Sequence, residues 1–88
     1  MNIKILGPGC AKCHQLEKTT GEVVKELDID ATVEEVKDMR QIIAYNVLTT
    51  PALVINEQVV SFGKVPSKTE VTQLIINAMA KEEQTKGP

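Results

Sequence analysis

The sequence has few of the residues on which several classes of small protein depend. Its 88 residues include two cysteines, one histidine, one tyrosine, one phenylalanine and no tryptophan. Two cysteines are too few for the dense disulfide framework of a small secreted domain, and adding the histidine still leaves a four-ligand zinc site incomplete. A net charge of −2, with both signs interspersed, and only two aromatic rings argue against binding of nucleic acid.

Long apolar runs are lacking as well. No stretch approaches the ~20 residues that are needed to cross a bilayer, so we expect no membrane association. The segment Met1–Leu6 has no basic start followed by a long apolar core, which is the pattern of a secretory signal, and we therefore expect a cytoplasmic protein. The length suits one small domain, which we place at residues 1–80, with a polar C-terminal tail at 81–88.

The hydrophobic pattern predicts seven elements in the order β-α-β-α-β-β-α. The expected strands cover 2–6, 31–36, 52–55 and 59–62, and the expected helices follow Cys10, Asp38 and the Ser67–Glu70 capping box. The first β-α-β unit needs a crossover, so its strands should be parallel, whereas the last two strands should form a hairpin. We therefore predict an α/β fold in which a mixed four-stranded sheet is flanked by three helices.

The two cysteines lie where the first strand runs into the first helix, in the string Cys10-Ala11-Lys12-Cys13. Residues three apart on a helical turn are about 5–6 Å apart, which suits a disulfide bond. The helix N-terminus and Lys12 should both favour a thiolate on Cys10. We therefore predict that Cys10 is the exposed attacking thiol with a lowered pKa, and that the more buried Cys13 resolves the mixed disulfide.

With these residues in place, the chain resembles the thioredoxin fold and, more closely, the small prokaryotic thioredoxin-like redox-active disulfide proteins. The resemblance covers roughly residues 1–80 and is carried by Gly7–Cys13, Tyr45–Val47, Thr49–Ile55 and Gly63. It implies that Pro51 is cis and packs beside the cysteine pair. It also implies that the backbone of Thr50 pairs with an extended segment of the substrate.

The chain also departs from the family pattern. Gly9 stands where thioredoxins usually carry tryptophan, and Ala11-Lys12 replaces their central Gly-Pro pair. We identify no counterpart of the acid that thioredoxins bury beneath the resolving cysteine, and no glutathione-contacting charges of the glutaredoxin kind. The reduction potential, the range of substrates and the electron donor therefore stay open.

From these residues we predict a thiol–disulfide oxidoreductase that reduces or exchanges disulfides in proteins or small molecules. Cys10 and Cys13 are the expected catalytic residues, and the expected supporting residues are Gly9, Lys12, Thr50 and Pro51. We expect no metal ligand among them and no cofactor besides the Cys10–Cys13 disulfide. The expected partners are disulfide-containing proteins and a thioredoxin-reductase-like or dithiol electron donor, and we expect a monomer.

Other functions use the same residues. Cys10 to His14 reads as the C-x-x-C-H string of haem attachment, but that use requires export and a large apolar pocket. The cysteine pair could instead carry a soft ion such as Cu(I) or Zn(II), with His14 as a third ligand. It could also be a structural disulfide, or belong to a thioredoxin-like module that serves a partner without broad substrates.

Overall fold

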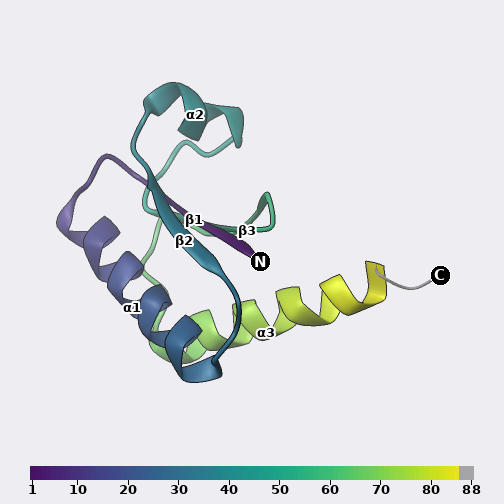
Figure 1. Cartoon of the computed structure of the whole chain (residues 1–88). Coiled ribbons are helices and arrows are strands. Elements are labelled where there is room, and N and C mark those ends of the chain that lie inside the picture. The colour runs from purple at the N-terminus through teal and green to yellow at the C-terminus, as the bar shows by residue number, and fades with distance from the viewer. Residues whose placement is uncertain (86–88) are drawn as a thin grey trace.

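The computed structural model describes the backbone of residues 1–85 and the side chains of residues 1–82. It contains all seven predicted elements in the predicted order (Figure 1). The elements are β1 (Asn2–Leu6), α1 (Ala11–Leu27), β2 (Thr32–Val36), α2 (Met39–Ala44), β3 (Ala52–Ile55), β4 (Gln58–Phe62) and α3 (Lys68–Thr85). In the described part of the chain no helix is long and apolar enough to cross a membrane.

The four strands form one mixed sheet in the order β2-β1-β3-β4. Strand β1 pairs in parallel with β2, as the crossover predicted, and antiparallel with β3. Strands β3 and β4 form the expected hairpin, and its turn residues Asn56 and Glu57 both have positive φ. Leu6, the last residue of β1, is opposite Ala52, the first residue of β3. The segment after β1 and the segment before β3 therefore leave the sheet at the same end.

Helices cover both faces of the sheet. Ile3 and Ile5 of β1 pack with α1 and α3 on one face, where Leu16 and Ile75 are fully buried. Leu6 points to the other face, which is covered by α2 through Ile42. Figure 1 shows α1 and α3 together on one side and α2 apart from them. The predicted sandwich of a mixed sheet between helices is confirmed.

The ends of the helices follow the predicted local signals. Asp38 caps α2 by accepting a hydrogen bond from the backbone N–H of Arg40, at 2.8 Å. At α3, Ser67 Oγ accepts from the backbone N–H of Glu70, and Glu70 Oε1 accepts from the backbone N–H of Ser67. This reciprocal pair is the predicted capping box. Short-range sequence patterns therefore fix where these helices begin.

Helix α3 does not stop at residue 80, where we placed the end of the domain. It continues to Thr85, because its last turns are held against the β3–β4 hairpin. Asn56 Nδ2 donates to Glu82 Oε1 at 2.8 Å, and Lys81 Nζ donates to Gln58 Oε1 at 3.4 Å. Most of the predicted polar tail is thus helical, and its residues 86–88 lie outside the described residues.

Candidate functional site

The cysteine pair lies at the N-terminus of α1, just beyond the end of the central strand β1. Cys10 is the N-cap residue and has an extended backbone, with φ −72° and ψ 169°. Its Sγ accepts a hydrogen bond from the backbone N–H of Cys13 at 3.3 Å. A sulfur atom therefore occupies the capping position that an oxygen usually takes.

The environment of Cys10 favours its thiolate. The Cys10 side chain is exposed and its thiol is free. A hydrogen bond from the Cys13 thiol and another from the Cys13 backbone N–H lower the pKa of Cys10, and the backbone N–H of Lys12 contributes in the same direction. Both the exposure and the direction of the shift agree with the sequence prediction. Lys12 contributes through its backbone N–H, and the expected effect of its side-chain charge on Cys10 stays a prediction.

Cys13 has the opposite environment. It is buried, with 2% of its surface exposed. Burial raises the pKa of the Cys13 thiol, and its hydrogen bond to Cys10 acts in the same direction. The two sulfurs are thus separated in both accessibility and acidity, as expected for one attacking thiol and one resolving thiol.

Gly7 makes room for the Cys13 sulfur. A Cβ built on Gly7 would lie closer than 3.0 Å to Cys13 Sγ and 3.7 Å from Thr50 Cβ. Gly7 therefore lies between α1 and the segment that precedes β3. From the sequence, Gly7 could be predicted only as part of a loop. Its contact with Cys13 depends on how the first turn of α1 packs against the end of β1.

The Thr50–Pro51 peptide bond is cis, as the family resemblance implied. Pro51 is buried, and its carbonyl oxygen accepts a hydrogen bond from the backbone N–H of Gly63 at 3.0 Å. Thr50 is the residue of this loop that faces Gly7. The cis-proline loop is therefore beside the cysteine helix.

Gly9 and Lys37 lie next to each other at the start of the cysteine motif. Gly9 has a φ of +93°, a region that favours glycine, so a residue with a side chain would be strained at this position. A Cβ built on Gly9 would lie 3.8 Å from Lys37 Nζ. The Lys37 ammonium group therefore approaches the backbone just before Cys10, which the sequence did not indicate.

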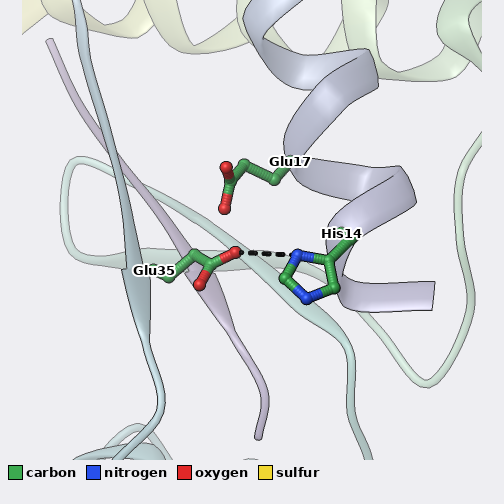
Figure 2. A group of neighbouring side chains, drawn as sticks. All are labelled: His14, Glu17 and Glu35. Carbon is green, nitrogen blue, oxygen red and sulfur yellow. Dashed lines mark ion pairs between the residues drawn. The ribbon is translucent and has the colours of Figure 1, made fainter. Parts of the chain in front are cut away.

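A group of ionisable side chains adjoins the cysteine helix (Figure 2). His14 and Glu17 extend from α1 toward Glu35 on β2, and His14 Nδ1 is 3.4 Å from Glu35 Oε1. A hydrogen bond between the carboxyl groups of Glu17 and Glu35 raises the pKa of Glu17 and lowers the pKa of Glu35. A hydrogen bond from Lys37 lowers the pKa of Glu35 further. Glu35 is on the same face of β2 as Val33, which packs into the core. A glutamate at an inward-facing strand position was the signal that sequence reasoning missed.

Comparison with known proteins agrees with this geometry. The family model described as "Thioredoxin domain" matches residues 1–76. The thioredoxin of Methanothermobacter thermautotrophicus is 41% identical over 75 residues, which cover 85% of this chain and 97% of that protein. The thioredoxin of Methanocaldococcus jannaschii is 37% identical over 71 residues, 81% of each chain. The solved structure of thioredoxin 1 from Thermosipho africanus has the same fold, with a TM-score of 0.61 and 24% identity over 94% of this chain and 99% of that one.

The fold and the Cys-x-x-Cys site define a thiol–disulfide oxidoreductase. The chain belongs to the thioredoxin family.

Proposed function

We propose that Cys10 and Cys13 are the redox-active pair and that the protein reduces disulfide bonds in protein substrates. The observation that carries the proposal is the contrast between the two sulfurs. Cys10 is exposed and its pKa is lowered, whereas Cys13 is buried and its pKa is raised. A thiolate is the nucleophile in disulfide exchange, so this contrast supports attack by Cys10 and resolution by Cys13.

The reaction then has two steps. The Cys10 thiolate attacks one sulfur of the substrate disulfide, forms a mixed disulfide and releases the other sulfur as a thiolate. Cys13 loses its proton and attacks Cys10 Sγ, which releases the second substrate sulfur and closes the Cys10–Cys13 bond. The substrate gains two electrons from the protein and two protons, one released by Cys13 and the other taken from solvent, to which Cys10 gave its proton when it ionised.

The supporting residues have distinct roles in this proposal. Gly9 allows the backbone conformation that leads into Cys10, and Lys12 supplies a backbone N–H to the thiolate. Thr50 is next to Gly7 at the edge of the site, where its backbone would pair with an extended substrate segment. Pro51 holds that loop against Gly63.

A thioredoxin-reductase-like enzyme or another dithiol would regenerate the reduced pair, and the cycle needs no cofactor besides the disulfide. We further propose that the protein acts as a monomer in the cytoplasm, and that its catalytic domain, placed at residues 1–80 from the sequence, also includes the last turns of α3 up to Thr85.

Insulin reduction by dithiothreitol tests the catalytic roles. We expect the wild-type protein to accelerate this reduction and the Cys10→Ser variant to lose that acceleration. The Cys13→Ser variant should accumulate a mixed disulfide with insulin, which a non-reducing gel detects. Full activity of the Cys10→Ser variant would show that the roles are wrong. An inactive wild-type protein with a reversible Cys10–Cys13 couple would favour a dedicated electron-transfer module, and a potential far below the glutathione range would indicate a static disulfide.

A further inference from the structure

The side chains of His14, Glu17 and Glu35 converge on one point beside α1 (Figure 2). His14 and Glu17 are three residues apart and therefore lie on one face of α1. Glu35 reaches the same point from β2, on the face of the sheet that α1 covers. The group thus joins two elements that are far apart in the sequence, and it combines an imidazole nitrogen with two carboxylates.

The separation of the His14 and Glu35 ligand atoms suits a small metal ion, and Glu17 lies close enough to join them. One ligand atom from each of the three side chains lies within 4.8 Å of the other two. His14 Nδ1 and Glu35 Oε1 are 3.4 Å apart, which is longer than an ordinary N–H···O hydrogen bond of about 2.7–3.2 Å. Two ligands at Zn–N and Zn–O distances of about 2.0–2.2 Å and a tetrahedral angle would be about 3.4 Å apart.

The charges around the group also suit a dication. Two carboxylates and a neutral imidazole would neutralise a charge of +2. Lys37 is the cation beside the group, and its Nζ binds Glu35 Oε2 at 3.2 Å. The other oxygen of Glu35, Oε1, faces His14 and is the one that a metal would use. The Glu35 side chain is only 19% exposed, so little of its surface is available to water.

We propose that His14, Glu17 and Glu35 form a site for Zn²⁺, separate from the cysteine sulfurs. Zinc accepts imidazole and carboxylate ligands together, whereas Mg²⁺ and Ca²⁺ prefer oxygen ligands alone. The three side chains supply three ligands, and water occupies the fourth position because His14 is at the surface, with 59% of its side chain exposed. A bound ion would fasten the first turns of α1 to β2. This site does not depend on the proposed redox cycle.

Calorimetric titration with ZnCl₂ tests the site, in a Cys10→Ser/Cys13→Ser protein that has no competing thiolates. We expect one ion per chain, and at least a tenfold weaker affinity in the same protein carrying His14→Ala or Glu35→Gln. Glu34→Gln is the matched control. Glu34 is the neighbour of Glu35 in β2 and, because side chains alternate along a strand, points to the opposite face of the sheet, the face of its register partner Lys4. The zinc affinity of this variant should be unchanged. If the double variant does not fold, the same titration is made on oxidised wild-type protein, in which the Cys10–Cys13 disulfide leaves no thiolate to compete for zinc.

Several results would overturn the proposal. One is the absence of zinc binding up to millimolar concentration, and another is equal zinc affinity after His14→Ala or Glu35→Gln. A third is Mg²⁺ binding as tightly as Zn²⁺, because the imidazole would then not be a ligand. Titration with Co²⁺ gives an independent reading. Removal of the His14 imidazole should change the visible absorption of bound Co²⁺, whereas Glu34→Gln should leave it unaltered.

Discussion

At the scale of single residues, the site depends on a glycine, Gly7, whose lack of a side chain leaves space in the core. Gly7 leaves room for the sulfur of Cys13, and no other residue type would do so without movement of α1 or β1. The contact involves backbone on one side and a buried sulfur on the other, so neither partner can rotate away easily.

We expect Gly7→Ala to lower the free energy of unfolding by about 1–3 kcal/mol, as other overpacked cores do. Urea unfolding of the reduced protein measures the change. Gly21→Ala is the control, because Gly21 is within α1 and a Cβ there would have no heavy atom within 4 Å. That variant should gain up to about 1 kcal/mol through helix propensity. Equal stability of the two variants would contradict the proposed contact at Gly7.

The acidity of Cys10 gives a pH-dependent prediction. Because hydrogen bonds from Cys13 lower the pKa of Cys10, its alkylation by iodoacetamide should reach half of its maximal rate at a lower pH than an unperturbed cysteine. Cys13→Ala removes the thiol donor and should move this midpoint to higher pH, with a several-fold slower reaction at pH 7. Cys13→Ser keeps a donor and should stay nearer to wild type. Identical midpoints in all three proteins would show that the thiol hydrogen bond has no effect.

At the scale of elements, the start of α3 is the clearest test of a local signal. Ser67 and Glu70 satisfy each other's backbone N–H groups at the first turn. We expect Ser67→Ala to cost about 0.5–2 kcal/mol of stability, measured by thermal or urea unfolding. Ser67→Asp keeps an oxygen acceptor at this position and should lose much less. A larger loss in the aspartate variant than in the alanine variant would argue against the cap.

These elements show why sequence reasoning succeeded where it did. The Asp38 and Ser67 caps, the turn at Asn56 and the alternating strands depend on residues within a few positions of one another, so their order and approximate bounds could be predicted. The spacing of Cys10 and Cys13 and the N-cap position of Cys10 are local in the same sense, whereas the burial of Cys13 also depends on its packing against Gly7.

The remaining site residues depend on contacts between elements. Glu35 approaches His14 only because β2 lies beside β1 and under α1, and Gly7 approaches Thr50 only because β1 and β3 pair at Leu6 and Ala52. No local pattern contains those distances. The cis bond before Pro51 was available from the resemblance to a family and from no local pattern.

At the scale of the whole molecule, the last turns of α3 connect the end of the chain to the hairpin. The bonds from Asn56 to Glu82 and from Lys81 to Gln58 lie beyond the predicted domain end at residue 80. A chain ending at residue 80 should therefore be less stable than the full chain, by about 1 kcal/mol for each bond that is lost. A chain ending at residue 85 is the matched control. Equal stability of the two truncated chains would support the boundary at residue 80.

The close contact between Gly7 and the Cys13 sulfur also bears on oxidative damage. Oxidation of a thiol beyond the disulfide adds oxygen atoms to sulfur, and these need space and access to peroxide. The Cys13 sulfur is covered by the backbone at Gly7, whereas Cys10 is open to solvent. Peroxide therefore meets Cys10 first, and the sulfenic acid formed there has Cys13 as a neighbouring thiol with which it can condense. The packing that buries the Cys13 sulfur thus directs the first oxidation to Cys10, where the sulfenic acid can be converted to the reversible Cys10–Cys13 disulfide.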